Sequence, residues 1–141
     1  MEILLIEDDE AVRNFICEVL LAAGCCVSVA GNGNEGLAEI KSNPDIAMVI
    51  TDIIMPDKEG IETIMEIKQS WPQIKILAMS GGGKVCAEEY LHIAGALGAD
   101  VTLKKPFTRN EFLSAVESLS GHKSPEMNMA AIDGNAAVSE A

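Results

Sequence analysis

Basic residues are scarce in this chain. Ten Lys and Arg stand against 22 Asp and Glu among 141 residues, which leaves a formal net charge of -12. Nucleic acids and anionic membranes bind proteins through clustered Lys and Arg, because phosphate groups are negative. The composition therefore argues against both as partners, and it favours a partner with a basic or an apolar surface.

Long apolar runs are also lacking. No stretch approaches the ~20 apolar residues that a membrane-spanning helix needs. The N-terminus has neither the basic region nor the apolar stretch of a signal peptide. We therefore expect a cytoplasmic protein without a membrane segment.

The cysteines show no metal-binding pattern. Cys17, Cys25, Cys26 and Cys86 have no Cys-x-x-Cys spacing and no histidine at metal-ligand spacing. Reduced and mostly buried thiols are the expectation. Because neighbouring side chains of a strand point to opposite faces, Cys25 and Cys26 cannot both face the core.

The chain does contain enough apolar sequence for one core. Its 141 residues are 48% apolar, which suits one domain rather than two. We place this domain at residues 1–121. Residues 122–141 are rich in Ala, Ser, Asn and Met without sustained periodicity, which predicts a disordered tail.

Runs of β-forming residues alternate with segments whose apolar residues recur at helical spacing. Five strands alternating with five helices specify an α/β fold, a parallel sheet with helices on both faces. Asn34 is the predicted N-cap of the second helix, and Thr108 with Glu111 has the spacing of a capping box for the last. The expected strands are residues 3–6, 25–30, 48–51, 74–79 and 101–103, and the expected helices are residues 12–23, 35–41, 61–71, 86–97 and 109–120.

Polar residues whose side chains could take part in catalysis or metal binding follow four of the predicted strands. Glu7 and Asp8 follow the first, Asp52 the third, Ser80 the fourth and Lys105 the fifth. Ligands of such sheets bind at the carboxyl ends of the strands, so these side chains should converge. Crowded carboxylates call for a divalent cation that prefers oxygen. Together with a hydroxyl and an ammonium group they suit phosphoryl chemistry.

Each of these residues also has a simpler interpretation when taken alone. The acidic run from Glu7 to Glu10 would suit the positive N-terminal end of the first helix. Asp52 could cap a turn, Ser80 could be an ordinary hydroxyl, and Lys105 could be a solvated surface lysine. The joint placement favours the functional interpretation.

Four motifs in this order make the chain resemble the receiver domain of bacterial two-component response regulators, over residues 1 to about 120. They are LLIEDDE (4–10), the D-x-x-M-P-x-x-x-G pattern (52–60), LAMSG (77–81) and KPF (105–107). The resemblance implies a flavodoxin-like, doubly wound sheet with strand order 2-1-3-4-5. The form that the sequence resembles most is a stand-alone receiver, since no output domain follows.

The resemblance also implies a magnesium site. Asp8, Asp52 and the backbone carbonyl of Ile54 would ligate Mg²⁺, and Glu7 would act mainly through water. These are oxygen ligands, the type that Mg²⁺ prefers.

Asp52 would accept a phosphoryl group from a histidine kinase or a histidine phosphotransfer protein, as the resemblance implies. Lys105 would pair with the phosphoryl oxygens, Ser80 would hydrogen-bond the phosphate, and the Lys105-Pro106 bond would be cis. Lys104 should point away, because strand side chains alternate. A downstream protein would read the face made by the fourth helix, the fifth strand and the fifth helix.

Three positions depart from the common receiver pattern. Thr102 stands where many receivers carry an aromatic residue that switches between inward and outward positions. Ile54 and Gly82 stand where polar groups often help water attack the aspartyl phosphate. We therefore expect slow loss of the phosphoryl group.

The function that follows is that of a stand-alone response regulator, which relays a phosphoryl group or binds a target when phosphorylated. It would be no enzyme beyond its own phosphorylation and dephosphorylation. One alternative, motivated by Thr102, is a constitutive interaction module. Another is a Mg²⁺-dependent phosphatase of the haloacid dehalogenase type, but the second Asp that those enzymes carry two residues after the first is missing after both Asp52 and Asp8.

Overall fold

The computed structural model describes residues 1–53, 60–80, 92, 95 and 98–120. They form a five-stranded sheet with strand order β2-β1-β3-β4-β5, in which every neighbouring pair is parallel. This confirms the predicted fold class and strand order. The strands are β1 (Glu2–Ile6), β2 (Cys26–Ala30), β3 (Ile46–Asp52), β4 (Lys75–Ser80) and β5 (Val101–Lys104).

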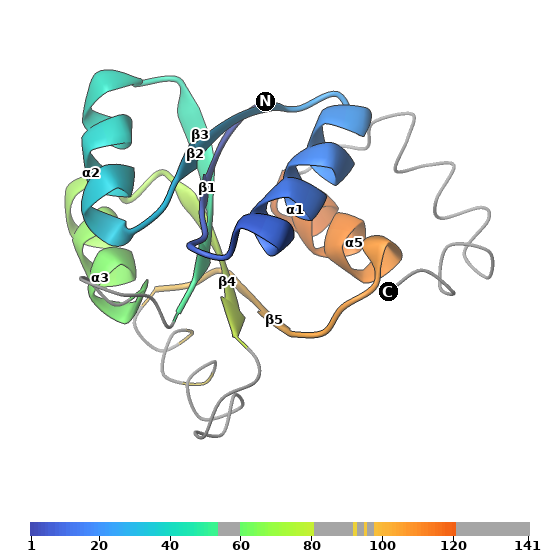
Figure 1. The fold of residues 1–141 in the computed structure, drawn as a ribbon. Helices are drawn as coiled ribbons and strands as arrows, with labels where there is room; N and C mark the ends of the chain where they lie inside the picture. Colours follow the sequence, from blue (N-terminus) through green and yellow to red (C-terminus); the bar gives the residue numbers. More distant parts are fainter. Residues whose placement is uncertain (54–59, 81–91, 93–94, 96–97, 121–141) are drawn as a thin grey trace.

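Helices cover both faces of the sheet (Figure 1). On one side lie α1 (Glu10–Ala22) and α5 (Arg109–Ser120), and on the other α2 (Gly33–Ser42) and α3 (Gly60–Ser70). The helix expected at residues 86–97 falls mostly outside the described residues, as does the expected tail at 122–141. His92 and Gly95 are described within that span, and both are helical.

The sheet separates two hydrophobic clusters. Ile3 and Leu5 of β1 pack towards α1 and α5, whereas Leu4 and Ile6 pack towards α2 and α3. All four are fully buried, as expected for a central strand of a parallel sheet with both faces covered. Each such side chain contributes roughly 1.5–3 kcal/mol of burial free energy. Hydrophobic burial on both faces therefore holds β1 rigidly at the centre of the sheet.

The helix termini show which capping predictions are correct. Thr108 and Glu111 form the expected capping box before α5, with each side chain accepting the backbone N–H of the other at 3.0 and 2.9 Å. Gly24 follows the C-cap of α1 with φ +87°, a conformation that glycine adopts without strain.

The prediction that Asn34 caps the N-terminus of the second helix is wrong. The cap is Asn32, whose side chain accepts the N–H of Glu35 at 2.9 Å, while Glu35 accepts the N–H of Gly31 at 2.9 Å. These two hydrogen bonds satisfy one free donor of the first turn, the N–H of Glu35, and the N–H of Gly31 just before the cap, so the helix begins earlier than predicted.

The described cysteines are free, and the prediction for the adjacent pair is confirmed. Cys25 is buried, Cys26 is exposed and Cys17 is partly buried. Burial raises the pKa of the Cys17 and Cys25 thiols. Among the described helices, none combines the length and apolar character needed to cross a membrane.

Candidate functional site

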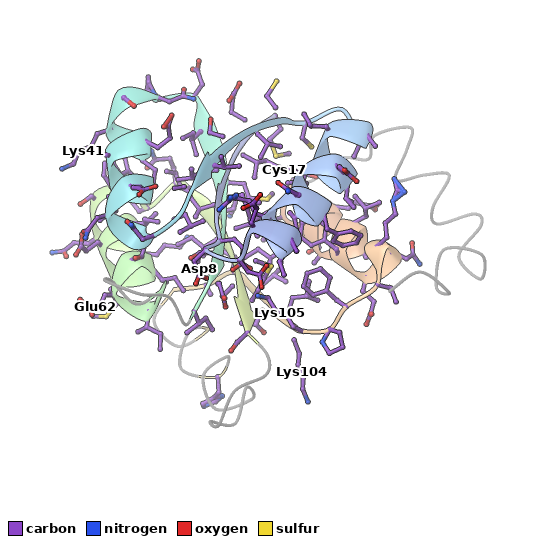
Figure 2. The ribbon with its side chains drawn as sticks, in the orientation of Figure 1. Asp8, Cys17, Lys41, Glu62, Lys104 and Lys105 are labelled. Carbon is purple, nitrogen blue, oxygen red and sulfur yellow. The ribbon has the colours of Figure 1, made fainter. Side chains whose placement is uncertain are left out.

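The predicted site residues come together at the carboxyl ends of the strands. Glu7 and Asp8 follow β1 and Asp52 ends β3, and one carboxylate oxygen of each lies within 4.8 Å of those of the other two. Figure 2 shows Asp8 and Lys105 at this same end of the sheet. The sheet thus concentrates negative charge at one point, as the order of the strands predicts.

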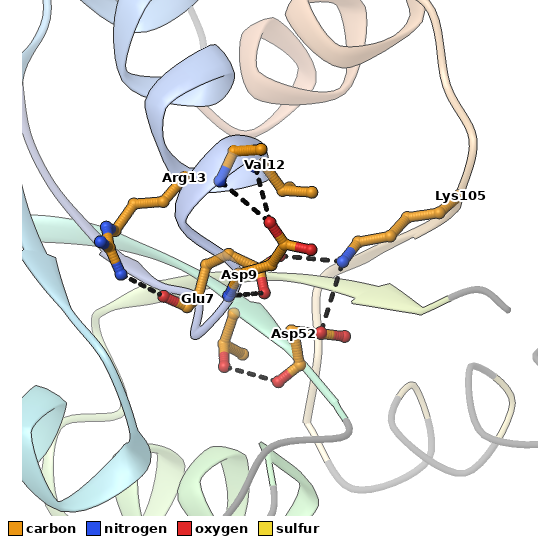
Figure 3. A network of polar contacts seen from close by, with 8 residues as sticks. Glu7, Asp9, Val12, Arg13, Asp52 and Lys105 are labelled. Carbon is orange, nitrogen blue, oxygen red and sulfur yellow. Dashed lines mark hydrogen bonds and ion pairs between the residues drawn. The ribbon is translucent and has the colours of Figure 1, made fainter. Parts of the chain in front are cut away.

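Lys105 supplies the positive charge inside this cluster (Figure 3). Its Nζ lies 2.8 Å from Oε1 of Glu7 and 3.3 Å from Oδ2 of Asp52. Burial by itself lowers the pKa of Lys105, but the hydrogen bond to Glu7 and the charge of Asp52 outweigh burial and leave that pKa raised. The lysine is therefore held in its charged form.

Glu7 is the buried member of the cluster, with no exposed surface. Its burial, reinforced by the charge of Asp52, raises the pKa of its carboxyl group, and the hydrogen bond from Lys105 only partly offsets this. Its Oε2 also accepts the N–H of Asp9 at 3.3 Å. A carboxylate in this position attracts any available cation.

The four acids from Glu7 to Glu10 divide into two pairs. Asp9 is the N-cap of α1, because its Oδ1 accepts the N–H groups of Ala11 at 2.9 Å and Val12 at 3.2 Å. Glu10 occupies the first turn of the helix. The simpler interpretation of this run is therefore correct for Asp9 and Glu10, and the functional one places Glu7 and Asp8 in the cluster.

The backbone around Asp52 is tightly held. Ile53 donates to the carbonyl of Met79 at 2.9 Å and accepts the N–H of Gly60 at 2.7 Å. A Cβ at position 60 would collide with the carbonyl of Asp52 and with the backbone of Ile53. Glycine at the start of α3 is therefore what allows the helix to approach the strand end that carries Asp52.

Ser80 and Lys105 are joined through the main chain. Ser80 is buried at the end of β4, and its carbonyl accepts the N–H of Lys105 at 2.8 Å. The Lys105-Pro106 bond is cis, as expected. Lys104 is exposed, in agreement with the prediction that it points away from the site, and Thr102 of β5 is also exposed.

Two of the predicted positions lie outside the described residues. These are Ile54, with its expected metal-binding carbonyl, and Gly82. Sequence reasoning also missed one contact, a hydrogen bond of 3.2 Å from Nη1 of Arg13 to the carbonyl of Glu7. The signal that could have found it is a basic residue one turn into the helix that follows the acidic run.

The cluster of Glu7, Asp8 and Asp52 suits a hard divalent cation. One carboxylate oxygen from each of the three side chains lies within 4.8 Å of the other two, which is close enough for one ion to be held among them directly or through water. Asp8 is exposed, so an ion could enter from solvent. The donor set matches Mg²⁺ better than a metal that prefers sulfur or nitrogen.

Comparisons with known proteins find relatives over most of the chain. The family model described as response regulator receiver domain matches residues 3–117. The chain is 32% identical to the response regulator MprA of Mycobacterium avium over 127 residues, which are 89% of this chain and 54% of that protein. It is 30% identical to the transcriptional regulatory protein CpxR of Klebsiella pneumoniae, over 84% of this chain and 48% of that protein. The chain thus spans about half the length of these curated relatives.

Solved structures resemble the fold over most of the chain. A response regulator receiver domain protein of Clostridium thermocellum has a TM-score of 0.77 and 27% identity, and the match covers 93% of this chain and 97% of that one. A CheY-like receiver domain protein of Methanospirillum hungatei has a TM-score of 0.76 and 27% identity, with coverages of 85% and 94%.

Proposed function

Because the chain belongs to the family of response regulator receiver domains, we propose that it accepts a phosphoryl group on Asp52 from a histidine-containing partner. The observation that carries the proposal is the position of Lys105, whose ammonium group bridges Glu7 and Asp52 at 2.8 and 3.3 Å. Such a cation beside a carboxylate nucleophile is placed to receive the charge of an incoming phosphoryl group.

In the proposed transfer, an Oδ atom of Asp52 attacks the phosphorus of a phosphohistidine. The P–O bond forms as the P–N bond breaks, and the imidazole leaves with the electron pair and takes up a proton. The product is an acyl phosphate whose phosphoryl group carries roughly -1.5 to -2 charges, in place of the single negative charge of the Asp52 carboxylate. Lys105 can then pair with the phosphoryl oxygens, and the Ser80 hydroxyl can donate to one of them.

We further propose that Asp8 and Asp52, together with the backbone carbonyl of Ile54, hold Mg²⁺, with Glu7 acting mainly through water. The fit of three carboxylates within 4.8 Å supports this. When bound, Mg²⁺ supplies positive charge that neutralises the carboxylates and the phosphoryl oxygens. The protein's own contribution is to orient Asp52 and to hold Lys105 charged.

The proposed output is a protein interaction that depends on phosphorylation, or onward transfer to a second histidine-containing partner. The downstream protein would bind the surface formed by β5 and α5, together with the helix expected at residues 86–97. Cytoplasmic location belongs to this proposal, and the free thiols of the described cysteines support it. In this function the chain catalyses only its own phosphorylation and dephosphorylation.

A second candidate is a receiver fold that binds its partner without phosphorylation. It is favoured by Thr102, which is exposed on β5 where many receivers carry an aromatic switch residue. The assembled cluster of Glu7, Asp52 and Lys105 favours the phosphoacceptor instead.

The deciding experiment measures intact mass after incubation with Mg²⁺ and acetyl phosphate. We expect wild type to gain one phosphoryl group, and Asp52→Ala to gain none. A matched control is Asp45→Ala, which removes an exposed acid just before the opposite end of β3 and should still be phosphorylated. A folded wild type that binds Mg²⁺ but gains nothing, from acetyl phosphate or from a phosphorylated histidine phosphotransfer protein, would favour the constitutive module.

A further inference from the structure

Arg13 contacts the site but has no role in the proposed transfer. It is the fourth residue of α1 and is partly buried. Its Nη1 donates to the backbone carbonyl of Glu7 at 3.2 Å, and Figure 3 shows it reaching Glu7 from the side opposite Lys105. Two cations therefore hold Glu7, one at its side chain and one at its main chain.

The carbonyl of Glu7 lies where the sheet ends. The N–H of Glu7 donates to the carbonyl of Ala30 at 3.0 Å, so the main chain of Glu7 faces β2. The N–H and C=O of one residue in a parallel pair face the same neighbour, but β2 ends at Ala30. The guanidinium of Arg13 thus takes the place of the strand donor that would come next.

This hydrogen bond acts on the peptide that joins Glu7 to Asp8. Because a peptide unit is planar, holding its carbonyl also sets the direction in which the main chain of Asp8 leaves. Asp8 is exposed, so burial does not hold its side chain. The distance between the carboxylates of Glu7 and Asp8 therefore depends on how firmly this peptide is held.

We propose that Arg13 is a positioning residue, which fixes the Glu7-Asp8 peptide and so keeps the two carboxylates together for a divalent cation. The inference rests on the proposed function, because it assigns Arg13 to the cation site of the phosphoacceptor. The planar guanidinium suits this role, since its donors are rigidly arranged.

If Arg13 is replaced, a positioning role and simple charge repulsion predict opposite changes in the affinity of the site for a divalent cation. Arg13 is positive, so removing its charge should by itself strengthen the binding of another cation nearby. If Arg13 instead positions the Glu7-Asp8 peptide, its removal should weaken the binding of the cation. Residues that orient metal ligands typically change metal affinity about 10- to 100-fold when they are replaced.

The test is calorimetric titration of the full chain with Mg²⁺, without a phosphodonor, for wild type, Arg13→Met and Lys104→Met. We expect the dissociation constant to rise about tenfold for Arg13→Met. Lys104→Met removes the same charge next to Lys105 and should leave the constant unchanged or lower it. An unchanged or lower constant for Arg13→Met would overturn the proposal.

A second measurement separates positioning from a general loss of structure. In metal-free protein, the amide ¹⁵N resonances of Asp8 and Asp9 should shift and show greater mobility in Arg13→Met, whereas amides of β4 should not change. Uniform changes across the sheet would mean that Arg13 acts only on stability. Failure of wild type to bind Mg²⁺ would instead contradict the metal site of the proposed function, so the two failures are distinguishable.

Discussion

Lys105 and Glu7 are 98 residues apart in the chain, yet their side chains form an ion pair with 2.8 Å between Nζ and Oε1. Glu7 is fully buried, whereas the side chain of Lys105 keeps 20% of its surface exposed. The pair joins the turn after β1 to the segment after β5. The strands at these two positions are separated in the sheet by β3 and β4, so the ion pair links distant parts of the fold across the strand ends.

Replacing Lys105 with Met should slow phosphorylation strongly. The substitution removes the ammonium beside Asp52 and keeps the volume of the side chain. Loss of one preorganised charge-stabilising group typically costs roughly 10²- to 10³-fold in rate. The measurement is the rate of mass gain from acetyl phosphate, with Lys104→Met as the control. A Lys105→Met rate close to that of wild type would contradict the role of this lysine.

Replacing Asp8 should affect Mg²⁺ binding, whereas replacing Asp9 should affect the free energy of unfolding. Asp9→Ala removes the N-cap of α1 and should lower the free energy of unfolding by about 1 kcal/mol, with Mg²⁺ binding retained. Asp8→Ala should abolish most Mg²⁺ binding without loss of metal-free stability, because it relieves repulsion in the cluster. Urea unfolding in a chelator and calorimetric titration give the two quantities. Equal effects of both variants on Mg²⁺ binding would argue against this division.

Gly60→Ala should disturb the strand end that carries Asp52. The added methyl would meet the backbone of Asp52 and Ile53, so α3 must retreat, and overpacking of this kind costs about 1–3 kcal/mol. Gly95→Ala is the matched control. It meets nothing within 4 Å and should gain roughly 0.5–1 kcal/mol from helix propensity. Urea unfolding checks both values, and a neutral Gly60→Ala would contradict the close approach.

Asp100 should make stability depend on pH. Its Oδ2 accepts the N–H of Ile76 at 2.8 Å and Nζ of Lys68 at 2.9 Å. Burial by itself raises the pKa of Asp100, but these two partners outweigh it and leave that pKa below its ordinary value of 3.8. A lowered pKa in the folded state means that the stabilisation is present above 3.8 and is lost as pH falls through the folded pKa.

The variant Asp100→Asn provides the measurement for this dependence. It should be less stable than wild type by about 1 kcal/mol near pH 7, because the charge-assisted contacts are lost. The difference should shrink below about pH 4 as the wild-type carboxylate becomes protonated. Urea unfolding across this range tests it, and a difference that is constant with pH would contradict the assigned cause.

Ile54→Asn should shorten the lifetime of phosphorylated Asp52. Isoleucine cannot orient a water molecule with its side chain, whereas the amide of an asparagine two residues after the proposed phosphoacceptor Asp52 can. The measurement is the decay of the phosphorylated mass after the phosphodonor is removed. A wild-type half-life no longer than that of the variant would contradict the expected slow dephosphorylation.

Local patterns predicted the elements well but some of their ends poorly. The apolar periodicities of the helices and the β-rich runs of the strands are properties of neighbouring residues, so they can be seen in the chain alone. The N-cap of α2 could not be chosen this way, because Asn32 and Asn34 are both good caps. Glu35 decided between them by pairing with the N–H of Gly31.

The sequence by itself determined the fold class and the placement of Glu7, Asp8, Asp52 and Lys105 at strand ends, and it predicts the phosphoryl chemistry that we propose for them. Only the tertiary structure decided which acid is buried beside the lysine, which acid caps α1, and that Arg13 holds the main chain of Glu7. The physical reason is that residue type and periodicity are local, whereas burial, charge pairing and hydrogen-bond partners depend on segments that only folding brings together.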